Sequence, residues 1–343
     1  MLPGEPLALA IDDASKVGEA RRAAVALARR LGFDETKRGH VAIVVTEVAT
    51  NLFKHAVGGE LILQELEAGQ ARGLEILAID RGPGMADIGR CFVDGFSTAG
   101  SPGNGLGAIS RLSSSVEIDS VLGVGTVSSA RLWDVAPTQA GRSDPLEWGA
   151  VNLPFPGEEV SGDAWGIAAD SGQTLIVVAD GLGHGPHAAE ASRAAVREFH
   201  ASAALGPVGI LGAAHAALRG TRGVAMAVAR LDPNRREIVY CGVGNIAGAI
   251  VKPGEGRGQS LVSHNGTVGH TVRKIQEFVY PWEEGSLLIM HSDGLATHWR
   301  LDRHAGLARK HPSLIAGVLY RDSARGRDDV TVLVARERSA CDR

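Results

Sequence analysis

A short apolar strand that ends in an acidic, glycine-rich turn is the first feature suited to chemistry. Residues 175–179 are apolar and largely β-branched, which is typical of a buried strand. Asp180 follows at once, and glycines stand at 181, 183 and 185. A strand end holds a carboxylate in a fixed position, and glycines let the backbone approach what it binds. Hard divalent cations prefer oxygen ligands, so we predict a metal site here, with a polar turn as the alternative.

Three further acids occupy comparable places in the second half of the chain. Asp163 stands just before a predicted strand, Asp293 just after one, and Asp329 at the start of the last one. Converging acids repel each other unless cations lie between them. Two divalent metals about 3.5–4 Å apart, clamping a phosphate and activating a water, would satisfy such a cluster. Scattered surface loops are the alternative.

In the first half, a predicted helix at about 36–56 carries a polar stripe. Glu47, Asn51 and His55 follow at intervals of four, with Lys54 beside them, so they share one helix face. A polar stripe on a mostly apolar helix fits contact with a triphosphate and Mg²⁺. Glu47 then serves as base, Asn51 as metal ligand, and Lys54 or His55 lies near phosphate. A solvated helix face is the alternative.

Glycine-bearing turns accompany this helix in a specific order. After Glu-x₃-Asn come Asp-x-Gly-x-Gly, Gly-x-Gly-x-Gly running into a helix, and Gly-x-Gly-Thr between two strands. Backbone amides of such loops and helix N-termini face phosphate groups. The residues concerned are Asp80, Gly82, Gly84, Gly103, Gly105, Gly107 and Thr126.

Together these motifs resemble the GHKL (Bergerat-fold) ATPases over about residues 5–134. The segments 94–98 and 110–112 look most like the switch-protein serine kinases of bacterial stressosomes (RsbT type). The resemblance implies a layered α/β sandwich that binds Mg-ATP. It assigns the adenine amino group to Asp80, Mg²⁺ to Asn51 and the hydroxyl proton of a protein substrate to Glu47. The remaining ATP contacts fall on Lys54, His55, Gly82, Gly84, Gly103, Gly105, Gly107 and Thr126.

The second half resembles the SpoIIE branch of the metal-dependent PPM Ser/Thr phosphatases over about residues 147–336, and in particular the RsbX type. The motifs are Ser-Gly-Asp163, Asp180-Gly-Leu-Gly-His-Gly, Gly242-Val-Gly-Asn245, Ser292-Asp-Gly-Leu and Arg327-Asp-Asp-Val-Thr331. The resemblance implies a β-sandwich flanked by helix pairs, with two Mn²⁺ or Mg²⁺ at one rim. Asp180 would bridge the metals and Gly181 would supply a carbonyl. Asp293 and Asp329 would hold one metal, assisted by Asp163.

Composition limits the remaining classes. The net charge of −4 lacks the excess of basic residues that is typical of nucleic-acid-binding proteins. No apolar run approaches the roughly 18 residues of a membrane span. The N-terminus lacks a signal-peptide pattern, and three scattered cysteines argue against a disulfide framework. We therefore expect a cytoplasmic protein without nucleic-acid or membrane partners.

The expected fold class is a two-domain α+β protein, with a Bergerat-type α/β sandwich followed by a PPM-type α-β-β-α sandwich. The expected domains are 1–136 and 147–338, joined by a polar, proline-bearing linker at 137–146.

The leading functional hypothesis is a signalling enzyme of opposed activities. The first domain would phosphorylate Ser or Thr with ATP, and the second would hydrolyse phospho-Ser or phospho-Thr. The resemblance implies a STAS-domain phosphoprotein or antagonist, or a sigma-factor regulatory module, as partner. In one alternative, the first domain is a non-catalytic, ATP-gated protein-binding module. In another, the whole chain is a scaffold without phosphatase activity.

Overall fold

The computed structural model describes residues 6–56, 58–91, 105–137, 146–170 and 172–338. The chain divides into two compact units, one within 4–143 and the other within 144–343. Gly103 and the segment 94–98 lie outside the described residues.

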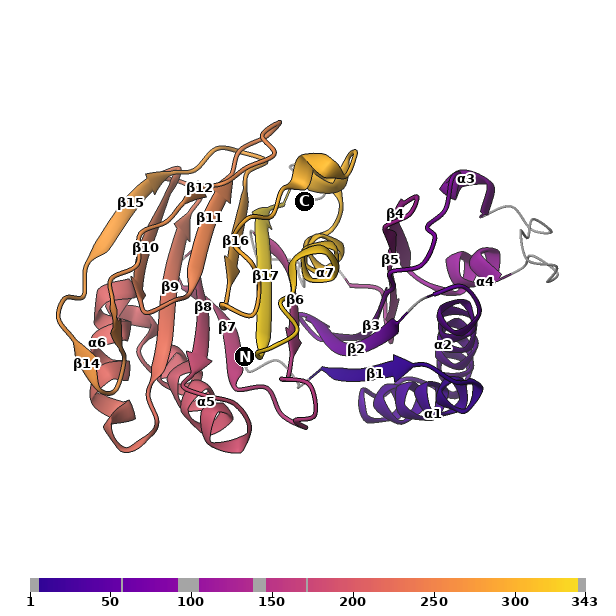
Figure 1. Ribbon diagram of the computed structural model, residues 1–343, viewed down its shortest axis with the longest axis horizontal. Helices are drawn as coiled ribbons and strands as arrows, with labels where there is room; N and C mark the ends of the chain where they lie inside the picture. The colour runs from indigo at the N-terminus through magenta and orange to yellow at the C-terminus, as the bar shows by residue number, and fades with distance from the viewer. Residues whose placement is uncertain (1–5, 57, 92–104, 138–145, 171, 339–343) are drawn as a thin grey trace. The chain divides into compact units, whose positions relative to one another are not determined.

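The first unit is an antiparallel sheet covered by helices (Figure 1). The order of its strands is β1-β2-β3-β5-β4. The strands are β1 (Leu7–Ile11), β2 (Gly59–Ala68), β3 (Ala71–Ile79), β4 (Ser115–Val121) and β5 (Gly125–Trp133). The helices are α1 (Ala14–Arg30), α2 (Glu35–His55), α3 (Ile88–Cys91) and α4 (Gly105–Leu112). This is the layered α/β arrangement that the motifs predict.

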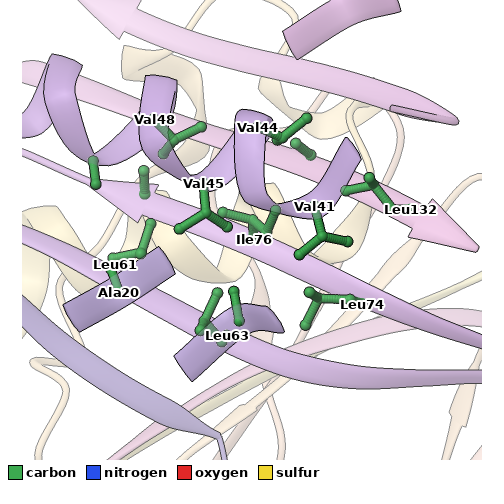
Figure 2. Packing of buried hydrophobic residues seen from close by; sticks show 14 of the residues in the cluster. Ala20, Val41, Val44, Val45, Val48, Leu61, Leu63, Leu74, Ile76 and Leu132 are labelled. Carbon is green, nitrogen blue, oxygen red and sulfur yellow. The ribbon is translucent and has the colours of Figure 1, made fainter. Parts of the chain in front are cut away.

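One face of α2 packs on this sheet, and its periodicity explains the orientation of the polar stripe. Buried α2 valines recur at helical spacing and meet alternate residues of β2, β3 and β5 (Figure 2). They are Val41, Val44, Val45 and Val48, and they face Leu61, Leu63, Leu74, Ile76 and Leu132. Because these positions face the sheet, Glu47 and Asn51 lie at the edge of the buried stripe, where both are partly exposed.

The N-terminal cap of α1 differs from the sequence-based prediction. The sequence predicts a helix that runs to about Leu31 with Ser15 as its N-terminal cap, but Asp13 caps it. The Asp13 Oδ1 atom accepts hydrogen bonds from the backbone N–H groups of Ser15 at 2.6 Å and Lys16 at 3.2 Å. The Asp13 carboxylate thus accepts from N–H groups of the first turn, and Ser15 lies inside that turn.

The second unit consists of two five-stranded antiparallel sheets, ordered β15-β10-β9-β8-β7 and β12-β11-β16-β17-β6, beside a small β13-β14 ribbon. The strands of the first sheet are β7 (Asp163–Asp170), β8 (Gln173–Gly181), β9 (Val224–Asp232), β10 (Glu237–Val243) and β15 (Glu277–Pro281). Those of the second are β6 (Leu146–Leu153), β11 (Ala247–Val251), β12 (Gln259–Ser260), β16 (Leu287–His291) and β17 (Val330–Glu337). The ribbon is β13 (Gly266–Thr267) with β14 (Thr271–Val272).

Helices lie on the outer face of each of these sheets. The helices α5 (Pro186–Ala201) and α6 (Gly206–Ala217) pack on β7, β8 and β9, and α7 (Pro312–Ser323) packs on β6 and β17 (Figure 1). Apolar side chains from the facing sheets, among them Ile176, Tyr240 and Leu333, form the central core. The unit is therefore the α-β-β-α sandwich that the motifs predict.

Among the described residues, no single helix has the length and apolar character needed to cross a membrane. Two consecutive helical stretches, Pro186–Ala201 and Ala203–Gly220, reach that threshold only together, and they are bent by 70°.

Candidate functional site

Two of the predicted metal ligands face each other across a strand pair. Asp163 at the start of β7 is directly opposite Asp180 near the end of β8 in the antiparallel register. Side chains at opposed positions project from the same face with Cβ atoms about 4.5–5.5 Å apart. A hydrogen bond of 3.1 Å from the Gly181 N–H to the Gly162 carbonyl continues the pairing beyond these acids.

The other two acids come from the second sheet. Asp293 follows β16 and Asp329 precedes β17, which are antiparallel neighbours, so both stand at the same edge. The backbone N–H of Ser292 donates to the Thr331 carbonyl at 3.1 Å. The Thr331 N–H donates to the Ser292 hydroxyl at 2.9 Å. These bonds fix the two acid-bearing turns to each other.

The acids lie within each other's electrostatic fields. Burial, followed by the negative charges of Asp163 and Asp293, raises the pKa of Asp180 to about 9. Burial also raises the pKa of Asp163 to about 7, and the charge of Asp329 adds to this effect. Asp328 contributes to both shifts. Without cations, this edge holds more carboxylate than it can ionise near neutral pH.

Several carboxylate oxygens at this edge have no hydrogen-bond partner. Neither oxygen of the buried Asp163 accepts a hydrogen bond of normal geometry, although the hydroxyls of Ser292 and Thr331 lie near enough to favour its ionised form. The Oδ1 atom of Asp329 accepts from the Phe155 N–H at 2.7 Å, whereas its Oδ2 atom is unpartnered. Buried carboxylates cost free energy unless paired, so this donor set fits hard divalent cations.

The described carboxylates do not converge closely enough on one point to form a complete metal site. Within the described ranges, no three side chains of His, Cys, Asp or Glu are close enough to hold one ion. The predicted ligands Asp163, Asp180, Gly181, Asp293 and Asp329 therefore share an edge, and their metal-binding roles stay predictions.

Gly181 occupies a position that admits no side chain. A Cβ atom built there would overlap the Ala188 carbonyl oxygen in the first turn of α5. The helix α5 thus packs directly against the backbone of residues 180–185, the segment predicted to bind metal and called the metal loop below. Only glycine at position 181 permits this approach.

Asn245 supports Asp293, and its role was missed from the sequence. Its Nδ2 atom donates a hydrogen bond of 2.7 Å to Asp293 Oδ2. Asn245 precedes β11, 48 residues before Asp293 in the chain. Because sequence spacing contains no information about such a contact, only the fold reveals it.

Glu158 and His184 form a second unforeseen pair beside the metal loop. The His184 Nδ1 atom lies 2.7 Å from Glu158 Oε1. The imidazole also stacks on the Phe155 ring at 4.7 Å, and the Phe155 N–H is the donor to Asp329. The sequence motif flags His184, but its partner Glu158 lies in an irregular segment without a recognisable pattern.

We expect Asn245→Ala to weaken Mn²⁺ binding by about 10- to 100-fold, because groups that orient metal ligands have effects of that size. The measurement is a Mn²⁺ titration of phosphatase activity. Asn234→Ala is the matched control, because Asn234 is exposed in the β9–β10 turn. An unchanged Mn²⁺ midpoint in Asn245→Ala would show that the hydrogen bond to Asp293 has no supporting role.

In the first unit, Glu47 and Asn51 meet the start of α4. A Cβ atom built on Gly105 would lie 2.8 Å from Glu47 Oε2 and 3.9 Å from Asn51 Oδ1. Neither side chain makes a hydrogen bond or ion pair within the part of the chain that the structure describes. The predicted base and metal ligand therefore lie side by side against the glycine-bearing start of α4.

Asp80 and Thr126 also come together. Asp80 Oδ1 accepts hydrogen bonds from the N–H groups of Gly82 at 2.6 Å and Thr126 at 3.3 Å. The Asp80-Gly82 turn lies against the end of α2, since a Cβ atom on Gly82 would be 2.6 Å from the His55 carbonyl oxygen. The adenine-reading acid predicted from sequence is thus held beside the helix with the polar stripe.

The remaining predicted ATP contacts differ in their surroundings. The side chains of Lys54 and His55 are exposed at the end of α2. Gly84 adopts a positive φ of 71° in the turn after Asp80. Gly107 is buried in the first turn of α4 and not in the loop that the sequence pattern predicts. Gly103 lies outside the described residues.

Family models match both units of the chain. Residues 11–131 match the histidine kinase-like ATPase domain, and residues 170–338 match the Stage II sporulation protein E (SpoIIE) family.

Two proteins from Bacillus subtilis (strain 168) are also similar to parts of this chain. Serine/threonine-protein kinase RsbT is 35% identical over 107 residues, which cover 31% of this chain and 80% of RsbT. Phosphoserine phosphatase RsbX is 29% identical over 158 residues, which cover 46% of this chain and 78% of RsbX.

A solved structure, described as "The bacterial stressosome: a modular system that has been adapted to control secondary messenger signaling", is also similar. It is 30% identical, covers 56% of this chain and 99% of its own, and has a TM-score of 0.51.

Fold and similarity define a two-domain protein, with a histidine kinase-like ATPase unit followed by a SpoIIE-type phosphatase unit. The chain belongs to the RsbT-type histidine kinase-like ATPases in its first unit and to the SpoIIE phosphatases in its second. The two resemblances inferred from the motifs are confirmed.

Proposed function

We propose that the second unit removes phosphate from phosphoserine or phosphothreonine of a partner protein. The observation that carries this proposal is the buried Asp163, whose two unpartnered oxygens lie opposite Asp180 at an edge shared with Asp293 and Asp329. Such a donor set needs cations, and a phosphatase of this fold uses them for hydrolysis.

In this proposal two Mn²⁺ or Mg²⁺ would be held by Asp163, Asp180, Asp293, Asp329 and the Gly181 carbonyl, and Asp180 would contribute to holding both. When bound, the metals supply a water of lowered pKa and charge to neutralise the phosphoryl oxygens. The chain itself orients this set. Asn245 donates a hydrogen bond to Asp293, and the Phe155 N–H donates one to Asp329. In each of these two carboxylates, the hydrogen bond to one oxygen fixes the orientation of the group.

The first unit, we propose, binds Mg-ATP and transfers phosphate to Ser or Thr of a protein. Asn51 would hold Mg²⁺, Asp80 would accept from the adenine amino group, and Glu47 would take the hydroxyl proton. The adjacent side chains of Glu47 and Asn51 at Gly105, which have no partner among the described residues, support this assignment, as does the similarity to RsbT. Phosphoryl transfer requires mainly positioning and charge neutralisation, which such a site provides.

Both activities would act on STAS-domain proteins in stressosome or sigma-factor partner switching. The names of RsbT and RsbX, a serine/threonine-protein kinase and a phosphoserine phosphatase, support opposed chemistry in the two units. The proposed domains are 1–136 and 147–338, joined by the linker 137–146.

The deciding experiment is mass spectrometry of candidate STAS-domain proteins incubated with this protein. Addition of ATP should produce phosphorylated Ser or Thr, and later Mn²⁺ with ATP removed should reverse it. Phosphate removal without any phosphate addition would instead favour the first unit as an ATP-gated binding module. Absence of removal from every phosphorylated partner in Mn²⁺ would reject the phosphatase proposal.

A further inference from the structure

Arg222 lies over the loop that follows Asp180. In the antiparallel register, Asp180 pairs with Ala225 and Gly181 with Val224. A hydrogen bond of 3.1 Å from the Leu182 N–H to the Gly223 carbonyl extends this pairing past the strand end. Continued by a further residue, the register sets Arg222 opposite Gly183.

The side-chain geometry agrees with that register. A Cβ atom built on Gly183 would lie 3.0 Å from the Arg222 Nη1 atom. The guanidinium group therefore covers the backbone of the metal loop at a residue that has no side chain of its own. Gly183 has a φ of 87°, so the loop is shaped around a glycine where the arginine approaches.

The backbone on either side of Arg222 is firmly held. The Thr221 hydroxyl accepts from the Gly223 N–H at 3.0 Å and donates to the Leu218 carbonyl at 2.8 Å. The His270 Nε2 atom lies 3.0 Å from the Thr221 carbonyl oxygen. A side chain on a fixed backbone loses less conformational entropy on binding a ligand. Arg222 is thus presented to the metal loop by the fold.

Within the part of the chain that the structure describes, the charge of Arg222 is not compensated by an ion pair. Its side chain is exposed, and no carboxylate forms an ion pair with it among the residues that the structure describes. A guanidinium group is always charged, and its forked N–H groups match two oxygens of one phosphate. A free guanidinium beside a loop that starts with Asp180 suits an anion brought to that edge.

We propose that Arg222 binds the phosphoryl oxygens of the phosphomonoester substrate and so sets substrate affinity. This inference rests on the proposed phosphatase function. It predicts that affinity for the phosphate dianion itself depends on Arg222, whatever protein carries that phosphate.

The test compares Arg222→Ala and Arg222→Lys with the wild type in Mn²⁺. For a phosphoserine peptide, Arg222→Ala should raise KM by about 10- to 100-fold and change kcat by less than about threefold, because a bidentate charged contact is lost. The inhibition constant of inorganic phosphate should rise in proportion, and Arg222→Lys should restore part of both. Arg219→Ala, an exposed arginine three residues earlier, is the control and should leave both constants unchanged.

Calorimetric titration of inorganic phosphate into the Mn²⁺-loaded protein separates this inference from the phosphatase proposal, because it needs no turnover. Unchanged phosphate affinity in Arg222→Ala would overturn the proposed role of Arg222. This holds even if KM for a phosphopeptide rose, because Arg222 could then contact an acidic residue of the peptide and not its phosphate. A shifted Mn²⁺ midpoint with unchanged phosphate affinity would likewise reject it and make Arg222 a clamp on the loop. A wild type that binds phosphate through Arg222 but hydrolyses no phosphopeptide would contradict the phosphatase proposal alone.

Discussion

Asp180→Asn is expected to lower phosphatase turnover by at least about a thousand-fold in saturating Mn²⁺. In the proposal Asp180 would help to hold both metals, so its loss would remove the chemistry that the metals supply, a water of lowered pKa and charge to neutralise the phosphate. Single-turnover hydrolysis of a phosphoserine peptide is the measurement. The same variant should bind Mn²⁺ more weakly in calorimetry.

The fold of this variant should survive in the absence of metal. Burial and neighbouring acids raise the pKa of Asp180 to about 9, so its metal-free side chain is already protonated at pH 7. A neutral amide therefore replaces a neutral acid, and the thermal midpoint in EDTA should match that of the wild type. Asp302→Asn is the control, since Asp302 is exposed and pairs with Arg300 away from the acidic edge. Asp180→Asn with wild-type turnover would eliminate the dinuclear assignment.

Glu47→Gln is expected to lower ATP-dependent phosphorylation of a partner protein by about 100-fold or more, which is the usual effect of losing a general base. ATP binding should persist, because glutamine keeps the size of the side chain and Asn51 remains. Incorporation of labelled phosphate and binding of a fluorescent nucleotide measure the two effects. Asn51→Ala should instead lose Mg-dependent nucleotide binding.

Two controls sharpen this result. Glu35→Gln changes an exposed acid in the first turn of the same helix and should leave phosphorylation intact. Phosphatase activity of Glu47→Gln should equal that of the wild type, because Glu47 belongs to the other unit. Phosphorylation that survives both Glu47→Gln and Asn51→Ala would show that this site is not a kinase centre.

Periodicity was sufficient to predict most of the elements. The valines of α2 recur at helical spacing, so the helix predicted at about 36–56 matches α2 within one residue at each end. The apolar run 175–179 predicts a strand, and it lies inside β8. Periodicity does not predict the shortest strands. The strands β12, β13 and β14 each span two residues, which is too short for any alternation to appear.

The α1 cap shows a different limit of local patterns. Both Asp13 and Ser15 are good capping residues, and they are only two positions apart. Which of them caps α1 depends on where the chain leaves β1, and this is set by packing of the helix on the sheet.

The sequence alone determined the family, the order of the two units and the identity of the acids at the strand ends. It could do so because a strand or helix records its buried face in its own periodicity, and because the glycine and acid motifs are local. Only the tertiary structure decided that Asn245 supports Asp293, that Glu158 pairs with His184 and that Arg222 covers Gly183. The first two contacts join residues that are 48 and 26 positions apart in the chain. The third depends on the register in which β8 and β9 pair, and no local sequence pattern specifies either feature.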